Sequence, residues 1–426
     1  MNFAKRVYEM LDMAARAHAK WDIETSTSIV RNRKKLLLLL ALATPILVVS
    51  LAGAADQLPE ILGGKKAYAP AYYTSEIFLV SIVIGLCAGL ITGCIGAGGG
   101  FIITPALMSA GIKGILAVGT DLFHIFAKAI MGTTVHKKLG NVSVGLAMAF
   151  LVGSGVGVVG GGIVNRTLYE SNPVLSDTFI SLLYVVLLGF LGIYSLMDFL
   201  KLRKQGGDID AHGGGDAGQM NGSGKKPLSA RLQSANIPPM ISFDHDLQPG
   251  GKKIPGLFVA ICGSIVGFVA AIMGVGGGFL TFPMFVYILG VSSFTTVGTD
   301  ILQIIFTAGF ASISQYAIYG FIFYTLAMGM LLGSLLGIQI GAMTTKVVKG
   351  IYIRGFYAMA ILAGFANRLF ALPAKLDELE IISISQAMAD NLATVGNVAF
   401  FIVIGIFAVW VMSKFFANVK TLRGEN

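Results

Sequence analysis

The 426-residue chain is poor in charged residues and in cysteine. Only 12% of its residues are Asp, Glu, Lys or Arg, whereas an average soluble domain has about 25%. Together with 55% hydrophobic residues, this scarcity excludes an ordinary soluble globular protein. The three cysteines stand in apolar segments and form no CxxC pair, so the sequence indicates neither a disulfide framework nor a metal site.

Two further absences narrow the function. The sequence has no GxxxxGK[ST] phosphate loop and no nucleophile–base pair at a recognisable spacing, so we expect neither an enzyme nor a cofactor. The net charge of +9 does not indicate a nucleic-acid partner. Most basic residues form short clusters beside apolar runs, and such clusters set the topology of membrane proteins.

The apolar runs have the length of transmembrane helices and predict an all-α polytopic membrane protein with about 8–10 spans. The expected spans are residues 36–54, 75–94, 114–135, 142–164, 178–200, 254–273, 293–318, 321–343, 352–371 and 397–418. Two shorter apolar pieces, 100–111 and 278–290, cannot cross a hydrocarbon core of about 30 Å.

These runs divide the chain into six regions. We expect a cytoplasmic N-terminal segment (1–35), an extra transmembrane helix (36–54), a first transport repeat (75–200), a cytoplasmic linker (201–253), a second transport repeat (254–371) and a C-terminal transmembrane helix (397–418). The linker is rich in glycine and charge, which predicts a poorly ordered segment.

A glycine-rich motif occurs twice. The sequence GAGGGF at 96–101 recurs as GVGGGF at 274–279, and each copy is followed by a proline and then by Val-Gly-Thr-Asp. If the basic clusters lie on the cytoplasmic side, both termini are cytoplasmic and the second copy starts on the opposite side of the membrane from the first. The sequence therefore predicts two inverted repeats, each a glycine-broken hairpin plus three transmembrane helices. The inversion also holds if each short piece is a full span, so the depth of the hairpins stays open.

The glycine clusters predict an anion-binding site. Each precedes a short helix, and the N–H groups at a helix start attract anions. Non-helical backbone at membrane depth is tolerated only within protein or along a wet cavity. Glycines at four-residue spacing later in each repeat are instead expected to pack helices closely; they are Gly153, Gly157 and Gly161, and Gly333, Gly337 and Gly341.

Ionisable residues within spans are functional candidates. Asp121, His124 and Lys128 share one helix face, and the second repeat has Asp300, Gln303 and Thr307 at the matching positions. Lys128 could hold an anion, or it could form a structural ion pair with an aspartate. The proton-coupling candidates are Asp121, Asp300 and His124, since histidine titrates near neutral pH. Arg368, near a helix end, is more typical of a lipid-headgroup contact.

On these residues the chain resembles the sulfite exporter TauE/SafE family, also called the toluene sulfonate uptake permease family. The match is the doubled GxGGGF-x3-P motif followed by Val-Gly-Thr-Asp, over about 75–200 and 254–418. The resemblance implies a plasma (inner) membrane carrier of sulfite or another small sulfur-containing anion, such as a sulfonate or thiosulfate. It also implies that the glycine clusters and two threonines line the pathway. The Asp after each Gly-Thr, the N-terminal extension and the long linker depart from the family pattern.

The predicted function is secondary transport of such an anion by alternating access, with the lipid bilayer as the second partner and a homo-oligomer as an option. The predicted substrate-binding residues are Gly98, Gly99, Gly100, Thr120, His124, Lys128, Gly276, Gly277, Gly278, Thr299 and Gln303. Two alternatives stay open. One is a cation- or proton-coupled antiporter that uses Asp121 and Asp300, and the other is a membrane sensor or scaffold that uses residues 1–35.

Overall fold

The computed structural model describes residues 75–95, 99–136, 143–204, 228–244 and 251–423. The predicted N-terminal segment, the span 36–54 and Gly98 lie outside these residues. Within them, one two-stranded sheet accompanies the helices. Seven described helices are long and apolar enough to cross a membrane, so the prediction of an all-α polytopic membrane protein is confirmed.

The helices occur in the same order in the two halves of the chain. The first half contains α3 (Ser75–Ile95), α4 (Gly100–Ser109), α5 (Gly114–His136), α6 (Val144–Ser171) and α7 (Pro173–Lys204). The second contains α9 (Gly256–Met273), α10 (Gly278–Pro283) with its π-helical continuation η5 (Met284–Leu289), α11 (Ser293–Ala311) with η6 (Ser312–Ala317), α12 (Tyr324–Thr344) and α13 (Gly350–Glu378). The last helices are α14 (Gln386–Ala417) and α15 (Val419–Arg423).

Local sequence signals fix the turns. Ser143 and Ser292 cap α6 and α11, because each side chain accepts a hydrogen bond from a backbone N–H in the first turn. Gly111 and Gly290 occupy equivalent turns before α5 and α11, with φ angles of 90° and 71° that favour glycine. Several helices extend beyond the expected apolar windows. In particular, α14 begins at Gln386 and α13 ends at Glu378, because polar residues continue a helix past its buried part.

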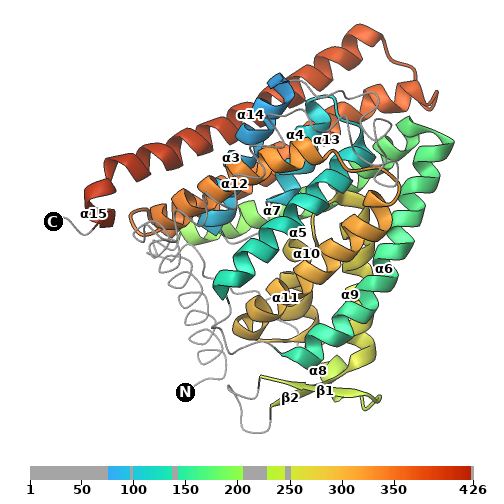
Figure 1. The fold of residues 1–426 in the computed structure, drawn as a ribbon, viewed down its shortest axis with the longest axis vertical. Coiled ribbons are helices and arrows are strands. Elements are labelled where there is room, and N and C mark those ends of the chain that lie inside the picture. Colours follow the sequence, from blue (N-terminus) through green and yellow to red (C-terminus); the bar gives the residue numbers. More distant parts are fainter. Residues whose placement is uncertain (1–74, 96–98, 137–142, 205–227, 245–250, 424–426) are drawn as a thin grey trace.

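The tightest helix pairs join one half of the chain to the other. Figure 1 shows α12 alongside α3 and α9 alongside α6. A Cβ atom added at Gly89 of α3 would lie 2.5 Å from the backbone oxygen of Ser334, and one at Gly157 of α6 would lie 2.7 Å from the backbone nitrogen of Phe268. The close-packing role predicted for the spaced glycines is confirmed. We call these two the cross-repeat pairs.

Equivalent helices of the two halves that touch each other run in opposite directions. On α5 and α11, Gly309 faces Phe126, whereas Gly119 faces Tyr316 further along the chain. On α7 and α13, Gly192 packs on Leu362 and Phe199 packs on Gly355. In both pairs, residue numbers rise along one helix as they fall along the other, which is antiparallel packing.

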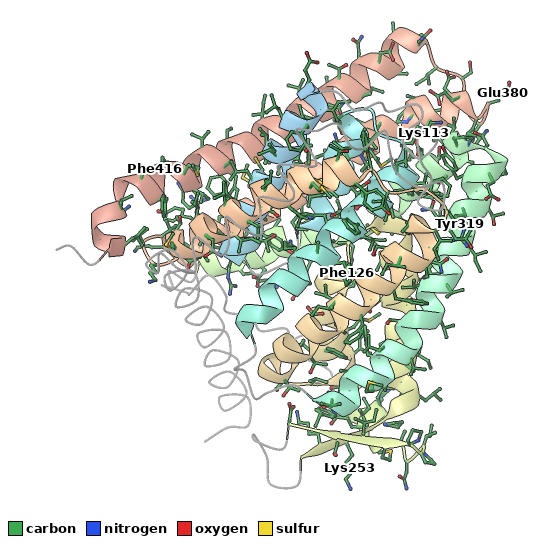
Figure 2. The ribbon with its side chains drawn as sticks, viewed as in Figure 1. Lys113, Phe126, Lys253, Tyr319, Glu380 and Phe416 are labelled. Carbon is green, nitrogen blue, oxygen red and sulfur yellow. The ribbon has the colours of Figure 1, made fainter. Side chains whose placement is uncertain are left out.

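The outer surface is apolar, as lipid contact requires. Large apolar side chains form exposed stripes on the outer helices, for example Val152, Val156 and Ile163 on α6. The outermost long helix is α14, which is only 28% buried over its apolar window. Figure 2 shows Lys113, Tyr319 and Glu380 towards one end of the molecule and Lys253 at the other.

Part of the linker folds onto α6 and onto helices of the second half. It forms α8 (Leu228–Ser234) and the antiparallel strands β1 (Met240–Phe243) and β2 (Lys252–Pro255), in which Met240 pairs with Pro255. The prediction of a poorly ordered linker is wrong for these residues. Phe243 and Ile254 are buried in a cluster with Leu146 and Phe150 of α6, so apolar burial orders this part of the segment.

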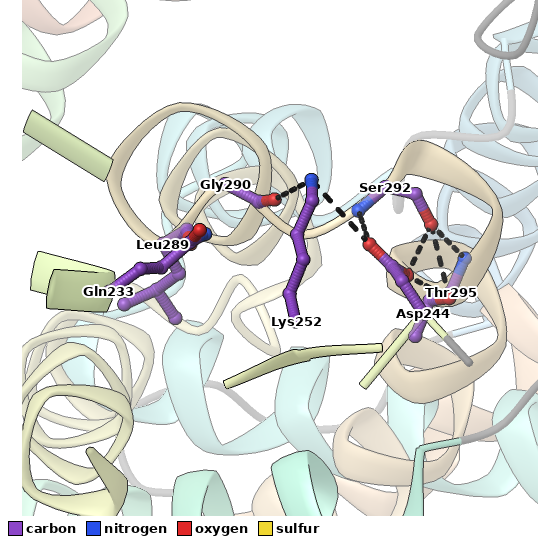
Figure 3. A network of polar contacts seen from close by, with 7 residues as sticks. All are labelled: Gln233, Asp244, Lys252, Leu289, Gly290, Ser292 and Thr295. Carbon is purple, nitrogen blue, oxygen red and sulfur yellow. Dashed lines mark hydrogen bonds and ion pairs between the residues drawn. The ribbon is translucent and has the colours of Figure 1, made fainter. Parts of the chain in front are cut away.

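The linker also holds the start of α11 (Figure 3). Asp244 accepts hydrogen bonds from the backbone N–H of Ser292 (3.0 Å) and from the Thr295 hydroxyl (2.6 Å). Lys252 lies 4.0 Å from Asp244 and donates to the Gly290 carbonyl. In the first half, Asp177 accepts from the backbone N–H of Gly114 at the start of α5 and pairs with Lys375 at 3.0 Å. Each central helix therefore starts against an aspartate paired with a lysine.

Candidate functional site

The two glycine breaks meet where the halves of the molecule touch. A Cβ atom added at Gly100 would lie 2.9 Å from the Cα atom of Val275, so the first break packs directly on the second. Gly274, Gly276 and Gly277 have φ angles of 78°, 66° and 87°, and residues with a Cβ atom rarely adopt such angles. Glycine is therefore needed here both for the backbone shape and for the close approach.

Short helices start at both breaks. Gly99 precedes α4 and Gly277 precedes α10, and both glycines are buried. The first N–H groups of a helix have no partner within that helix and carry partial positive charge. A Cβ atom added at Gly278 would lie 3.5 Å from Oδ2 of Asp300. In this conformation, a carboxyl group of the protein itself stands beside the start of α10.

The predicted threonines bond reciprocally across the two halves. Thr120 of α5 accepts a hydrogen bond from the backbone N–H of Phe323 (2.9 Å), which precedes α12. Thr299 of α11 accepts from the backbone N–H of Ser143 (3.3 Å), which precedes α6. The two equivalent hydroxyls therefore make equivalent bonds, and each ties a central helix to one cross-repeat pair.

Asp121 and His124 of α5 lie in a fully buried polar cluster. Oδ2 of Asp121 accepts a hydrogen bond from Thr104 (3.0 Å), and Oδ1 lies 3.7 Å from Nδ1 of His124. Nε2 of His124 is 2.9 Å from the Ser334 hydroxyl of α12. Oδ1 of Asp121 and Nδ1 of His124 have no hydrogen-bond partner among the described residues. Lys128 is partly buried one turn further on and interacts electrostatically with Asp121.

The matching residues of α11 form a continuous chain of hydrogen bonds. Gln303 donates to Oδ1 of Asp300 (2.7 Å) and to the Thr281 hydroxyl (3.0 Å). Thr307 donates to the side-chain oxygen Oε1 of Gln303 (3.1 Å), and its hydroxyl is 3.0 Å from that of Ser154 of α6. The predicted polar residues thus form two separate clusters, one on α5 and one on α11. The first contacts α4 through Thr104 and the second contacts α10 through Thr281, so each contacts the short helix that follows one glycine break.

Sequence reasoning missed the hydroxyl partners of these clusters. Thr104, Thr281, Ser154 and Ser334 are fully buried and bond to the predicted residues. Their only sequence signal is a hydroxyl group within an apolar helix, and such groups often bond to their own backbone instead. In the described part of the chain, no group of three or more His, Cys, Asp or Glu residues could hold a metal ion.

The position of Arg368 also differs from the predicted lipid-headgroup contact. Its side chain is 2% exposed, so it does not reach a lipid headgroup at the surface. It donates from Nε to Asn367 (2.7 Å) and from Nη2 to Ser109 (2.8 Å), at the end of α4. The dipole of α4 supplies at most about 2 kcal/mol to a cation at its C-terminus, whereas burying an ion costs several kcal/mol. The dipole of α4 therefore offsets only part of the free energy needed to bury the charge of Arg368.

Comparison with known proteins agrees with the resemblance of the motifs. The family described as sulfite exporter TauE/SafE matches residues 81–367. Similar curated proteins include the probable membrane transporter proteins YunE and YjnA of Bacillus subtilis (strain 168), which are 25% and 24% identical. These alignments cover 64% and 61% of this chain and 90% and 87% of the relatives. A probable membrane transporter protein of Sinorhizobium sp, ORF9, is 28% identical over 39% of this chain and 61% of its own length. No solved structure matches.

Proposed function

The chain belongs to the sulfite exporter TauE/SafE family, and on this premise we propose that it moves sulfite or another small sulfur-containing anion, such as a sulfonate or thiosulfate, across the plasma membrane by alternating access. A transporter role follows from the family and from the relatives that are named membrane transporters, and it is not an enzymatic one. The observation that carries the substrate proposal is the meeting of two glycine breaks between the halves of the molecule.

The helix arrangement supports inverted repeats, and the basic clusters of the sequence support cytoplasmic termini. The pair α3–α12 becomes the pair α9–α6 when each helix is replaced by its equivalent in the other half. The equivalent helices α5 and α11 touch in antiparallel fashion, and so do α7 and α13. Both properties are expected of two repeats related by a two-fold axis lying in the membrane plane.

The same contacts suggest which parts move. Backbone atoms touch across both cross-repeat pairs, so sliding within a pair would require the helices to separate. The bonds of Thr120 and His124 join α5 to α12, and the bonds of Thr299 and Thr307 join α11 to α6. We therefore take α3, α5 and α12 as one moving unit and α6, α9 and α11 as the other. Each unit contains helices of both repeats.

The anion would bind between these units, at the helix starts marked by the two glycine clusters. The lining residues we propose are Gly98, Gly99, Gly100, Thr120, His124 and Lys128 from the first half, and Gly276, Gly277, Gly278, Thr299 and Gln303 from the second. Two like charges about 4 Å apart repel by about 4 kcal/mol at an effective dielectric constant of 20. An ionised Asp300 therefore opposes anion binding at α10, and its protonation would remove that repulsion.

This competition gives a physical basis for coupling. A proton taken up by Asp300 or Asp121 would accompany the anion. His124, whose Nδ1 lies 3.7 Å from Oδ1 of Asp121, would exchange a proton with that carboxyl group after a small approach. The unpartnered Oδ1 of Asp121 also favours the second candidate function, a cation- or proton-coupled antiporter, because a carboxylate oxygen without a donor can bind a proton or a cation.

The substitution Lys128→Met separates these functions. Sulfite, thiosulfate and a sulfonate are tested as substrates of the full-length protein in proteoliposomes. Loss of the charge should reduce anion flux about tenfold or more, because charge-assisted contacts contribute about 1.5–3 kcal/mol. The control Lys113→Met alters a partly exposed lysine over the ring of Tyr169 and should leave flux unchanged. Intact anion flux in Lys128→Met, together with altered cation coupling, would favour the antiporter.

The sensor or scaffold alternative depends on residues 1–35, which lie outside the described part of the chain. Deleting them should leave flux intact if transport is the function.

A further inference from the structure

Arg368 lines a cavity that is separate from the glycine breaks. It has a volume of about 210 Å³ and lies between the end of α4, the start of α7, and helices α13 and α14. Its polar lining includes Ser109, Asp177, Arg368, Lys375 and Asn397. Since a water molecule occupies about 30 Å³ of liquid, the cavity has room for roughly seven waters, which exceeds the size of a small oxyanion.

The charge of Arg368 has no carboxylate in direct contact within this cavity, and Asp177 attracts it only over a longer distance. Among the described residues, no carboxylate forms an ion pair with it, and its two hydrogen-bond acceptors, Asn367 and Ser109, are neutral. The nearest candidate is Asp177, but that carboxylate already pairs with Lys375 at 3.0 Å and accepts the Gly114 backbone N–H at 2.7 Å. The other acidic residue of the lining, Glu378, is exposed at the rim.

The guanidinium of Arg368 also has N–H donors that its two hydrogen bonds do not use. Arginine carries five N–H donors, and Arg368 uses one on Asn367 and one on Ser109. The remaining three have no hydrogen-bond partner in the described part of the chain. A planar guanidinium matches the spacing of two oxygen atoms on one anionic group, and this bidentate geometry is the strong form of charge-assisted hydrogen bonding.

We propose that this cavity, the Arg368 cavity, binds one oxyanion group, with Arg368 as the charged ligand. Asn397, whose side chain is held by Asn367 at 2.8 Å, and Lys375, two turns further along α13 than Arg368, complete the polar lining. The site is additional to the one proposed at the glycine breaks, since it shares none of those residues. The oxyanion group could belong to a free solute such as sulfite or to the phosphate of a phospholipid.

Isothermal titration of the full-length protein with sodium sulfite tests the site, with sodium chloride at equal ionic strength as the reference. The titration is done in detergent free of phospholipid and is repeated with Arg368→Gln, Arg368→Lys and the control Arg354→Gln. Arg354 lies on the same helix but pairs with Asp198 at 3.2 Å, away from the cavity. We expect Arg368→Gln to lose one class of sulfite sites or to weaken it about tenfold or more. Arg368→Lys, which keeps the charge without the planar fork, should fall between Arg368→Gln and the wild type.

The outcomes distinguish the two possible sources of the oxyanion group, and they distinguish the Arg368 cavity from the proposed central site. If no sulfite binds at Arg368 but the wild type copurifies with more phospholipid phosphate than Arg368→Gln does, the ligand is a lipid headgroup and the oxyanion site stands. If Arg368→Gln equals Arg354→Gln in both sulfite binding and bound phospholipid, the proposal is overturned. Lys128→Met should keep the sites lost in Arg368→Gln. Failure of the central anion site would appear as unchanged flux in Lys128→Met, independently of this titration.

Discussion

A single methyl group added at Gly157 tests the backbone contact between α6 and α9. The new Cβ atom of Gly157→Ala would lie 2.7 Å from the backbone nitrogen of Phe268 and 2.8 Å from the carbonyl carbon of Ser264. Ordinary van der Waals contact begins at 3.4 Å. The carbonyl oxygen of Ser264 would lie closer still. Backbone atoms cannot rotate away as a side chain can, so the two helices would have to separate by more than 0.7 Å at this point.

The cost follows from the lost packing along the interface. A gap of 0.5–1 Å removes roughly a quarter to a half of the dispersion energy between facing atoms. Overpacking of this kind typically costs about 1–3 kcal/mol. The gain in helix propensity from Gly to Ala is about 1 kcal/mol at most and only partly offsets it. We expect Gly157→Ala to lower the free energy of unfolding by about 1–3 kcal/mol.

Gly155 provides a matched control on the same helix. No atom lies within 4 Å of a Cβ atom added there, so Gly155→Ala should be neutral or stabilise the protein by up to about 1 kcal/mol. The assay is unfolding of both purified variants in detergent, with anion flux normalised to folded protein. Equal changes in stability for the two variants would refute the contact, and with it the assignment of α6 and α9 to one moving unit.

Two further substitutions test the buried clusters. Asp300→Asn removes the negative charge beside the start of α10, so anion flux should continue but depend less on an imposed pH gradient. Flux is measured with and without that gradient, with Asp198→Asn, which alters a partly exposed carboxylate paired with Arg354, as the control; an unchanged dependence would rule out Asp300 as a coupling group. Ser334→Ala leaves Nε2 of His124 buried without its partner and should destabilise the protein by about 1–3 kcal/mol in thermal unfolding. In the same assay, Ser413→Ala, which alters an exposed serine bonded only to its own helix, should have no comparable effect.

The local pattern of apolar residues predicts the positions of the helices well. The apolar windows found the described long helices, because a membrane helix must be apolar over its whole crossing whatever its neighbours are. The spaced glycines were assigned correctly to close packing for a similar reason, since a small residue every fourth position forms a flat stripe on one helix face. The ends of α13 and α14 were misjudged because their terminal turns are polar and lie beyond the apolar windows.

The sequence does not predict which helices pack against each other. Helix α3 packs against α12 of the second half, and α9 packs against α6 of the first half. These pairings depend on tertiary packing, and the sequence of α3 does not indicate that α12 is its neighbour. The same holds for Arg368, whose position near a helix end suggested lipid contact. It is buried because α4 ends at Ser109 against α13, a contact between residues 259 positions apart in the sequence. The order found in linker residues 228–244 likewise depends on a partner surface on α6.

Comparison of α5 with α11 distinguishes residues that hold the fold together from residues whose chemistry differs between the two halves. Positions kept identical in both repeats, Thr120 with Thr299, make the same bond to the backbone of the other half, so their identity follows from the symmetry of the scaffold. Positions that differ do not share a bonding pattern. His124 contacts Ser334, whereas its counterpart Gln303 bonds within its own half to Asp300 and Thr281.

Lys128 extends this asymmetry to charge. Its counterpart is the neutral Thr307, which bonds to Ser154. The fixed positive charge of the proposed central site therefore belongs to the unit of α3, α5 and α12 alone. An anion held there would stay with that unit while the other unit moves past it, because the electrostatic attraction is one-sided. Exchanging the two residues, with Lys128→Thr combined with Thr307→Lys, would transfer the charge to the other unit without changing the net charge.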